Sequence, residues 1–366
     1  MSSRAPRKVA ILIDSLLGGG AERVAVDIAR ALDSERYAAH LVVTRSSGPL
    51  EALVHESGLA CTVLGRRRGF SPRAFLTARS IVRNGSLLHA HKYPGGMWGS
   101  LIAWSARRPL IVHEHTFDGR PSAARKLGYR FLISRAAKRI ICVAPSIAAS
   151  LVDEGVPAAL LEVIPNGVPT DAAIPRAEAR AELGLDSSRV VIGLIGRLRP
   201  EKRHELALEA LAILRGEGHD VTLCCVGDGP RLDELQRLAA QLGVASHVVW
   251  AGERPNAGRL VRAFDIGVLC SAYEGMPLAA LEVLVAGIPL VATAVGSLPL
   301  LLAEGGGRLV PSGDSRALAT ALSAELALLG REKRTAATHT ATDQFGLPRM
   351  IRDIQRVYDE VLIEWR

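Results

Sequence analysis

The stretch DIGVLCSAYEGMPLAALEVLVAGIPLVAT, residues 265–293, contains two short apolar runs separated by a loop and a helix. Residues 265–271 and 289–293 have the apolar, β-branched composition of buried strands. Between them, Pro277 suits the first position of a helix over 277–286, because its missing N–H would have no helical partner there. A strand, a helix and a second strand in this order predict a parallel β-α-β unit.

Such units recur along the chain in two series. Segments with strand character are predicted at 8–13, 40–44, 61–64, 110–115 and 139–145, and again at 190–196, 221–227, 248–252, 266–271, 289–293 and 307–311. Helical patterns lie between most of them, and a polar connector without strand character, about 170–189, separates the two series. The pattern predicts the α/β class: two Rossmann-like domains, 1–170 and 171–345, with a cleft between them. A last helix, about 346–366, is expected to pack back on the first domain.

The composition excludes several classes of protein. The chain has 366 residues, of which 48% are hydrophobic and 22% charged, as in a globular protein of about two domains. Aromatic residues are only 4%, which disfavours a protein that stacks on nucleic-acid bases. The five cysteines show no C-x-x-C spacing, so neither a disulfide framework nor a zinc site is indicated, and a reducing cytoplasm fits.

The N-terminal segment is basic and then apolar, as in a signal peptide. Asp14 interrupts the apolar run and three glycines follow it, so residues 8–13 are interpreted as a buried first strand. No other run approaches the roughly 20 apolar residues that span a bilayer. The sequence therefore predicts a cytoplasmic protein that does not cross a membrane, although it can lie on the inner face of one.

Charge is distributed unevenly between the two predicted domains. Residues 1–170 hold 23 Lys+Arg and 12 Asp+Glu, whereas residues 171–366 hold 22 and 25. Arg66, Arg67 and Arg68 lie beside Phe70, a combination that suits docking on anionic lipid or binding of a phosphorylated acceptor. A solvated arginine-rich face is the alternative.

Two glutamates flank the start of the helix in the opening stretch. Glu274 precedes it and Glu282 lies inside it, so both carboxylates can accept hydrogen bonds from ligand hydroxyls. The helix start between them is an anion site in which backbone N–H groups face the ligand. Its residues are Gly275, Met276, Pro277 and Leu278. A nucleotide sugar has hydroxyls on both sides of a diphosphate and would fit such a site. The alternative is that Glu274 and Glu282 are simply two solvated glutamates of a helix.

Arg197 and Lys202 follow the first strand of the second series. Two cations at a strand end can neutralise a departing diphosphate without a metal ion. The chain also lacks a D-x-D motif, the usual carboxylate ligands of Mg²⁺ or Mn²⁺. No metal ion and no bound cofactor are therefore expected.

The glycine-rich segment GGGAERV, residues 18–24, does not match a dinucleotide fingerprint. Arg23 occupies the place of the third glycine, which argues against an NAD-dependent enzyme. Gly19 and Gly20 still permit a phosphate to approach the following helix. The histidines of HAH (89–91) and HEH (113–115) raise the question of a metal site, but the sequence identifies no third ligand on a shared strand face.

Taken in order, these segments resemble the family 4 retaining glycosyltransferases of the GT-B fold. YEGMPLAALE (273–282) is similar to the E-x7-E motif of that family, and the glycine loop, the HEH segment, IPNGV (164–168), GRLRPEKRHELALEA (196–210) and VGDGP (226–230) follow its motif order. The resemblance covers nearly the whole chain. It implies a sugar transferase with a UDP- or GDP-sugar as donor. The intact E-x7-E motif and the low aromatic content argue against a nucleic-acid partner.

The resemblance also implies roles for individual residues. A histidine at the position of His115 hydrogen-bonds the donor sugar near its reacting carbon, with His113 as the alternative. Arg197, Lys202 and Glu274 complete the expected catalytic group, and the first domain is expected to hold a glycan or lipid-linked acceptor. A nucleotide-sugar epimerase of the same fold and a non-enzymatic binding module are the remaining alternatives.

Overall fold

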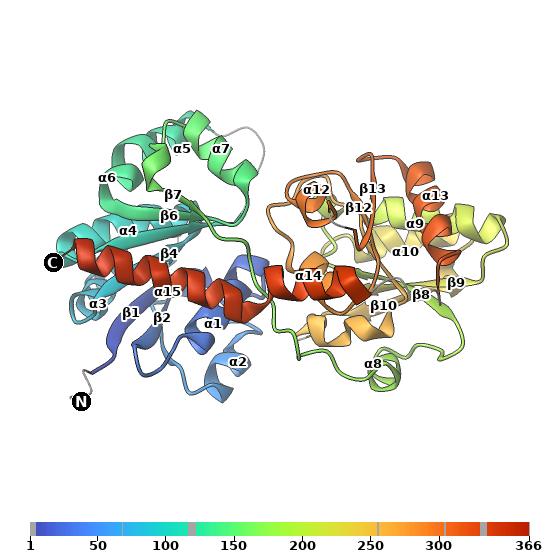
Figure 1. Cartoon of the computed structure of the whole chain (residues 1–366), viewed down its shortest axis with the longest axis horizontal. Coiled ribbons are helices and arrows are strands. Elements are labelled where there is room, and N and C mark those ends of the chain that lie inside the picture. The colour runs from blue at the N-terminus through green and yellow to red at the C-terminus, as the bar shows by residue number, and fades with distance from the viewer. Residues whose placement is uncertain are drawn as a thin grey trace. The chain divides into compact units, whose positions relative to one another are not determined.

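The computed structural model describes residues 5–67, 69–115, 122–254, 256–303, 305–329 and 335–365 (Figure 1). Contacts divide the chain into two compact units. The first contains the chain up to Gly167 together with the segment from Leu347 onward, and the second contains Val168–Gly346. Each unit is a parallel sheet covered by helices, so the predicted α/β class with two Rossmann-like parts is confirmed.

The first unit has a seven-stranded parallel sheet of order β3-β2-β1-β4-β5-β6-β7. Its strands are β1 (Arg7–Ser15), β2 (Tyr37–Ser46), β3 (Ala60–Val63), β4 (Leu87–His91), β5 (Leu110–Glu114), β6 (Ala137–Cys142) and β7 (Leu161–Val163). Its helices are α1 (Gly20–Ala31), α2 (Glu51–Glu56), α3 (Pro72–Arg83), α4 (Lys92–Ala106), α5 (Ala123–Gly128), the π-helical turn η1 (Tyr129–Ile133), α6 (Ser134–Ala136), α7 (Pro145–Asp153) and α15 (Leu347–Glu364). The strands β4 and β7 were missing from the predicted series.

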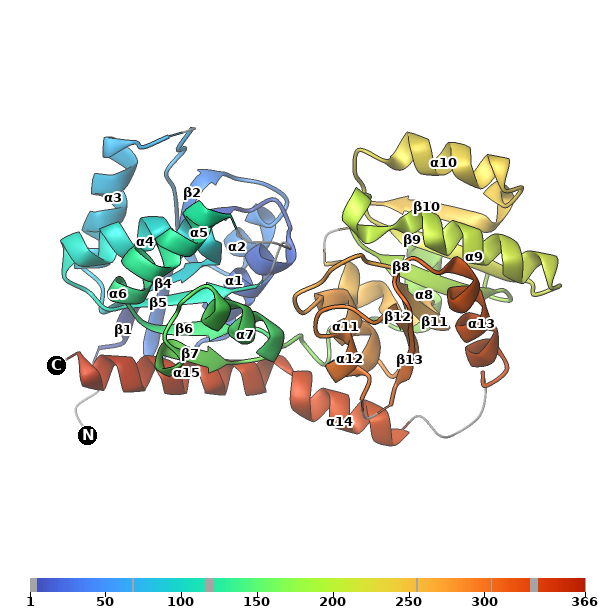
Figure 2. The same cartoon turned by 90° about the horizontal axis from the view of Figure 1, so that it is seen from above.

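The second unit has a six-stranded parallel sheet of order β10-β9-β8-β11-β12-β13 (Figure 2). Its strands are β8 (Val190–Ile195), β9 (Val221–Val226), β10 (Val248–Gly252), β11 (Ile266–Leu269), β12 (Leu290–Thr293) and β13 (Gly307–Val310). Its helices are α8 (Arg176–Glu182), α9 (His204–Gly216), α10 (Leu232–Gln241), α11 (Leu278–Val285), α12 (Leu298–Leu301), α13 (Ser315–Leu326) and α14 (Thr335–Phe345), with 3-10 turns η3 (Pro200–Lys202) and η5 (Ala257–Ala263). At the centre of the sheet, Gly193 lets the Phe264 ring pack on β8: an added Cβ would lie 2.1 Å from that ring.

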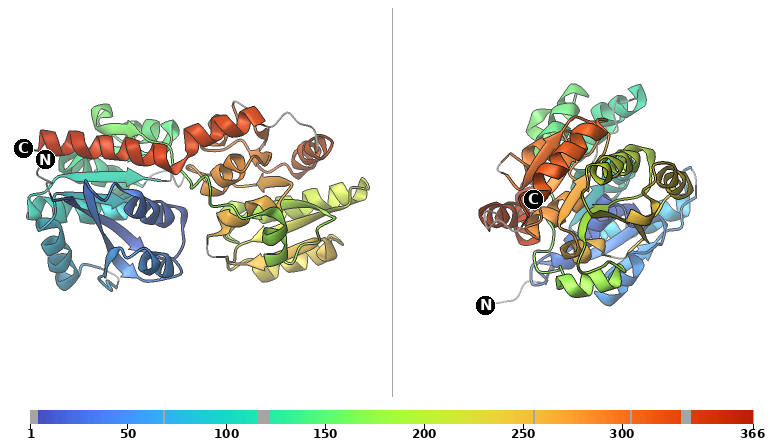
Figure 3. Two further views of the ribbon diagram at one scale, coloured as in Figure 1. Left: turned by 60° about the horizontal axis from the view of Figure 1, so that its bottom comes forward. Right: turned by 90° about the vertical axis from the view of Figure 1, so that its right-hand side faces the viewer.

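The helix α15 packs on the first unit, although it follows the whole second unit in sequence (Figure 3). Apolar side chains recur along it every three or four residues, which gives it one buried face. Met350, Ile354, Val357, Tyr358 and Val361 are all fully buried. Polar contacts fix the edges of this face: Arg349 donates to the backbone oxygens of Pro165 (2.8 Å) and Asn166 (2.9 Å).

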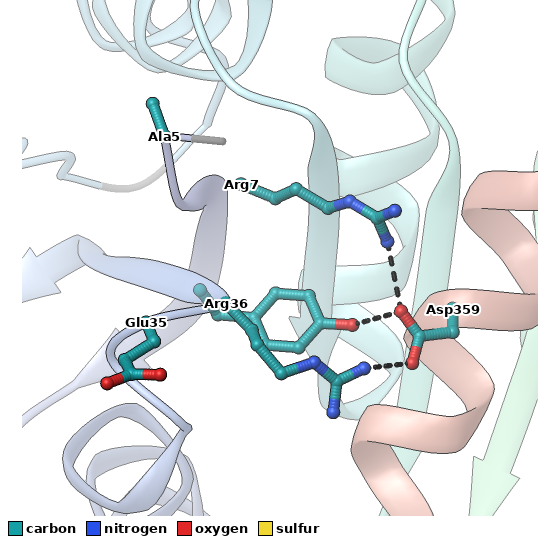
Figure 4. Close-up of a pocket in the computed structure, with 6 residues that line it drawn as sticks. Ala5, Arg7, Glu35, Arg36 and Asp359 are labelled. Carbon is teal, nitrogen blue, oxygen red and sulfur yellow. Dashed lines mark hydrogen bonds and ion pairs between the residues drawn. The ribbon is translucent and has the colours of Figure 1, made fainter. Parts of the chain in front are cut away.

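Asp359 connects α15 to the strands β1 and β2 (Figure 4). Its Oδ1 accepts from Arg7 Nη1 at 2.9 Å and from the Tyr37 hydroxyl at 2.7 Å, and its Oδ2 pairs with Arg36. These residues line a surface cavity of about 200 Å³. Because Arg7, Arg36, Tyr37 and Asp359 are bonded to one another, we interpret this cavity as part of the attachment of α15.

Candidate functional site

The donor-site residues predicted in the second unit lie at the point where its strand order reverses. From β8 the chain continues to β9 and β10 on one side of β8, and it then returns to form β11 on the other side. In an open parallel sheet the loops on the two sides of such a switch point diverge, and ligands bind beyond the carboxyl ends of the strands there. The loop after β8 carries Arg197 and Lys202, and the loop after β11 carries Glu274.

Lys202 and Glu274 meet across this switch point. Lys202 Nζ lies 2.5 Å from Glu274 Oε1, and the Ser271 hydroxyl donates to the same oxygen at 2.6 Å. The Glu274 side chain is 9% exposed and that of Lys202 is 27% exposed. The structure therefore brings these two predicted residues into direct contact, which the sequence did not indicate. A phosphate that bound to the Lys202 ammonium would do so beside the Glu274 carboxylate, which already contacts it.

The loop after β11 is held from both sides. The Ala272 N–H donates to Glu201 O at 2.8 Å, and the Ser297 N–H donates to Gly275 O at 3.1 Å. Gly296 has a φ of +56°, and an added Cβ there would lie 1.9 Å from Glu274 O, so only glycine allows the loop after β12 to approach this closely. Glu274 is thus oriented by a backbone that has little freedom.

Glu282 lies in the second turn of α11. The helix begins at Leu278 with Pro277 as its N-cap residue, so the predicted start at Pro277 is one residue too early. The described side chains include none that caps this end. The Glu282 carboxylate packs against the backbone of Gly258 in η5, where an added Cβ would lie 2.2 Å from Glu282 Oε1. Glu274 and Glu282 therefore contact different elements, one on each side of the helix start.

Arg197 is half-buried in the loop after β8, which packs against the loop after β9. Gly196 N–H donates to Val226 O at 3.0 Å and Leu198 N–H donates to Asp228 O at 3.0 Å. A Cβ on Gly227 would lie 2.1 Å from Gly196 O. Beneath Lys202, His204 is 1% exposed, and burial, together with the Lys202 and Arg231 charges, lowers the pKa of His204 to about 4. This imidazole is therefore neutral near pH 7.

In the first unit the strand order reverses between β1 and β4, and a second carboxylate–ammonium pair lies there. Glu22, in the first turn of α1, accepts from Lys92 Nζ at 2.7 Å. Glu22 also lies against the glycine loop: an added Cβ on Gly19 would be 2.3 Å from Glu22 Oε2, whereas Gly20 has open space. Sequence reasoning missed this pair, although Glu22 is part of the quoted GGGAERV segment and Lys92 directly follows HAH.

Four histidines gather on one face of β4 and β5. His91 Nδ1 lies 2.9 Å from His115 Nε2, and His89 Nδ1 lies 2.7 Å from the Tyr358 hydroxyl of α15. All four rings, including that of His113, are at least 96% buried. Burial lowers the pKa of His89 to about 3, and it lowers the pKa values of the other three well below the usual range. Lys92 reinforces this lowering for His91 and His115.

Three of these four imidazoles are close enough together to be considered as metal ligands. One nitrogen each of His89, His91 and His113 lies within 4.8 Å of the others, so the structure supplies the third ligand that the sequence did not identify. A metal ion binds imidazole along the nitrogen lone pair, in the plane of the ring, and three such lines must converge at one point. The planes of neighbouring rings lie only 5° to 31° apart. Near-parallel rings do not converge in this way, so the arrangement does not fit a bound metal ion.

Arg66 was predicted to be part of an exposed basic surface, but its side chain is largely buried. Its guanidinium lies 4.6 Å from the Trp98 ring centroid, donates to Gly69 O at 3.0 Å and is 3.8 Å from Asp14. The Arg66 side chain is 8% exposed, so Arg66 as a headgroup contact was wrong for this structure. Arg67 and Phe70 are exposed as expected, and Arg68 lies outside the described residues. Helices long and apolar enough to cross a membrane do not occur in the described part of the chain.

Two family models match consecutive parts of the chain. Residues 18–172 match the model described as Glycosyltransferase Family 4, and residues 175–344 match the model described as Glycosyl transferases group 1.

Several known proteins are similar in sequence over much of the chain. The GDP-mannose-dependent alpha-(1-6)-phosphatidylinositol monomannoside mannosyltransferase of Mycolicibacterium smegmatis is 35% identical over 205 residues, which cover 52% of this chain and 53% of that protein. The D-inositol 3-phosphate glycosyltransferase of Mycolicibacterium gilvum is 32% identical over 287 residues, or 70% of this chain and 62% of the relative. The chain thus spans between about half and less than two thirds of the length of these relatives.

Solved structures share the fold at lower identity. Anabaena Alr3699/HepE in complex with UDP-glucose superposes with a TM-score of 0.84 at 24% identity, and the match covers 97% of this chain and 100% of that one. Sucrose-phosphate synthase from Thermosynechococcus elongatus gives a TM-score of 0.78 at 18% identity, with 98% and 100% covered.

Proposed function

The chain belongs to the family 4, group 1 glycosyltransferases, and from this premise we propose that it transfers a sugar from a nucleotide diphosphate to an acceptor with retention of configuration. The observation that carries the proposal is the contact of Lys202 with Glu274 at the switch point of the second unit. It combines a cation for phosphate oxygens with an oriented carboxylate for sugar hydroxyls, where nucleotide ligands bind in such sheets.

Each donor-site residue predicted in the second unit has a role in this proposal. Arg197 and Lys202 hold the diphosphate and stabilise its charge as the glycosidic bond breaks, without a metal ion. Glu274 accepts hydrogen bonds from the transferred sugar, and Glu282 accepts them from the ribose. The backbone from Gly275 to Leu278, with Met276 and Pro277 between them, faces the phosphates at the start of α11.

The reaction follows from these roles. As the bond from the sugar to the diphosphate breaks, the acceptor hydroxyl attacks from the same face of the ring, and its proton passes to the departing phosphate oxygen. His115 hydrogen-bonds the transferred sugar in this proposal. Its imidazole is buried and neutral, so it can orient a hydroxyl without adding charge. UDP and GDP remain equal candidates for the nucleotide, because one similar structure holds UDP-glucose and one relative is GDP-mannose-dependent.

We propose that the first unit holds the acceptor and that this acceptor is lipid-linked. Residues 57–113 contain no aspartate or glutamate. Within that stretch, Phe70, Leu76 and Trp104 are 64%, 60% and 82% exposed on α3, α4 and the loop before them. Exposed cations, Arg67 and Arg73 among them, accompany these apolar side chains. Aromatic and aliphatic side chains with cations and no acidic residue suit the cytoplasmic face of an anionic membrane.

A panel of nucleotides and nucleotide sugars tests the proposed function. UDP, GDP, UDP-glucose and GDP-mannose are added to the protein in EDTA, and unfolding temperature and release of free sugar are measured. A donor at 100 times its dissociation constant should stabilise the fold by about 3 kcal/mol and be hydrolysed slowly. Interconversion of the donor sugar would indicate an epimerase instead, and binding without turnover in the presence of acceptor lipid would indicate a binding module. Glu217→Gln, an exposed glutamate on the second unit, is the matched control for Glu274→Gln.

A further inference from the structure

The carboxylate of Glu22 has one oxygen that is buried and unpaired. Glu22 is 8% exposed, and its Oε1 accepts from Lys92 Nζ at 2.7 Å. Its Oε2 is inaccessible to solvent and has no hydrogen-bond partner among the described residues. A buried carboxylate oxygen without a donor is unfavourable, because it has lost its hydration without gaining a hydrogen bond, so a donor from outside the chain is expected to complete it.

Two backbone features surround this oxygen: a glycine at position 19 and a positive φ at Lys92. Gly19 has no side chain that could fill the space, since a Cβ there would lie 2.3 Å from Oε2. Lys92 has a φ of +64°, an unfavourable backbone conformation for a residue other than glycine. Strain of this kind is unfavourable and persists only where the surrounding structure requires it. Here it occurs at the first residue after β4, and the ammonium of that residue holds Glu22.

The position matches that of a ligand site. Glu22 follows β1 and Lys92 follows β4, the two strands that flank the switch point of the first sheet. His91 and His115, at the ends of β4 and β5, are close enough to Lys92 for its charge to disfavour their protonation. The group is therefore made of a neutral ion pair and neutral imidazoles.

From this arrangement we propose that Glu22 Oε2 accepts a hydrogen bond from a sugar hydroxyl, held in place by Lys92. A neutral hydroxyl suits the site better than a phosphate, because a phosphate would meet the carboxylate directly. The space beside Gly19 and Gly20 then receives a hydroxyl, not the phosphate expected from the sequence. The inference rests on the proposed function, and the hydroxyl has two sources: the transferred sugar of the donor or a sugar of the acceptor.

Glu22→Gln is the test variant. Lys92 requires an acceptor, so the glutamine carbonyl takes the place of Oε1 and its NH₂ group takes the place of Oε2, which converts the hydroxyl acceptor into a donor. Glu22→Ala is the second variant and removes the group altogether. Glu51→Gln is the matched control, since Glu51 also lies in the first turn of a helix of this unit but is 47% exposed. Circular dichroism and thermal unfolding establish that each variant is folded.

Two binding measurements separate the sources of the hydroxyl. Calorimetry compares UDP with UDP-glucose and GDP with GDP-mannose; saturation-transfer NMR follows methyl α-glucoside and methyl α-mannoside as simple acceptor-like probes. If the donor sugar supplies the hydroxyl, the sugar-dependent part of the affinity falls at least 10-fold in both Glu22 variants while UDP and GDP bind as before. If the acceptor supplies it, nucleotide-sugar affinity is unchanged and the glycoside signal is lost.

Two other results overturn the inference, and they are distinguishable. Wild-type protein that binds nucleotide sugars or glycosides, with both Glu22 variants binding them equally well, would mean that no sugar hydroxyl bonds to Oε2, and the proposed function would stand. Wild-type protein that binds no nucleotide and no nucleotide sugar would remove the proposed function and the inference with it.

Discussion

The four buried histidines of the first unit predict that its stability depends steeply on pH between 6.5 and 5. An unfolded histidine has a pKa of about 6.5. In the folded state burial keeps His89, His91, His113 and His115 unprotonated to far lower pH, with the pKa of His89 at about 3. Between these values the unfolded state binds more protons than the folded one, so stability falls as pH falls.

The magnitude follows from the pKa values. At pH 5.5, one unit below the unfolded pKa, each such histidine destabilises the fold by about 1.4 kcal/mol, and four together by about 6 kcal/mol. Domains of this size are stable by about 5–15 kcal/mol, so the first unit is expected to be close to unfolding at pH 5. The second unit has His204, with a pKa of about 4, as its corresponding group and should withstand the same change.

The pH dependence of stability is measured by urea unfolding at half-unit pH steps. Hydrogen–deuterium exchange of peptides from each unit shows which unit loses stability. His113→Leu is the informative variant, because neither ring nitrogen of His113 has a hydrogen-bond partner in the described part of the chain. It should reduce the pH slope of the first unit by about a quarter. His55→Leu, which replaces a side chain 77% exposed, should leave the slope unchanged. Equal slopes for wild type and His113→Leu would refute the reasoning.

Four further predictions have clear expected outcomes. Lys202→Ala should lower kcat by on the order of 10²-fold, measured with EDTA present, because it removes one electrostatic contact to the leaving group. Glu282→Gln should raise the Kd for the nucleotide, measured by calorimetry. Glu274→Gln should chiefly lower kcat, measured from initial rates. Trp104→Ser should weaken co-sedimentation with anionic vesicles at low salt, and Arg189→Ser on the second unit should not. Gly193→Ala should destabilise the second unit by about 1–3 kcal/mol in urea unfolding, because the added methyl meets the Phe264 ring.

Opposite outcomes would contradict each of these. Loss of activity in EDTA with recovery in Mn²⁺ would remove the metal-free role of Arg197 and Lys202. Equal effects of the two glutamate changes on Kd and kcat would remove their separate roles. Vesicle binding that is insensitive to salt and to Trp104 would remove the membrane from the proposal, and a stable Gly193→Ala protein would show that Phe264 can move at little cost.

The strand and helix pattern was predictable because it depends on local composition. Buried parallel strands are continuous apolar runs, and DIGVLCS and PLVAT stand out for that reason. The short β7 (Leu161–Val163) carries too few residues to show such a run, and β4 (Leu87–His91) contains two histidines in place of aliphatic side chains. These two strands were missing from the predicted series on physical grounds. β7 is a short strand at the sheet edge, and the histidines of β4 interrupt its apolar run, although Leu87, Leu88 and Ala90 are fully buried.

The contacts within the site were not predictable in the same way. The distance between Lys202 and Glu274 depends on β8 and β11 being neighbours, and no local pattern encodes strand order. The same holds for Glu22 and Lys92, which are 70 residues apart in sequence. Arg66 shows the reverse error: a run of three arginines suggests a solvated surface, but Trp98 and Asp14 provide a partly enclosed place for one guanidinium. Composition cannot distinguish which member of the run is enclosed.

Each unit has a lysine–glutamate pair at the switch point of its sheet, but the order of the two residues along the chain is reversed between the units. At each switch point two loops diverge and leave polar backbone exposed to a ligand, and in each unit a lysine–glutamate pair connects those loops. In the first unit the glutamate follows the first strand and the lysine the fourth strand along the chain; in the second unit the lysine follows the first strand and the glutamate the fourth. Beside Lys202, Arg197 supplies a second cation, so the pair in the second unit suits a doubly charged diphosphate. Beside Lys92 the neighbours are neutral imidazoles, so the pair in the first unit is balanced in charge and suits hydroxyls. If this division is correct, inorganic pyrophosphate should compete with the nucleotide in wild type and Glu22→Gln equally and should lose affinity only when Arg197 or Lys202 is replaced; competition that depends on Glu22 would place phosphate in the first unit after all.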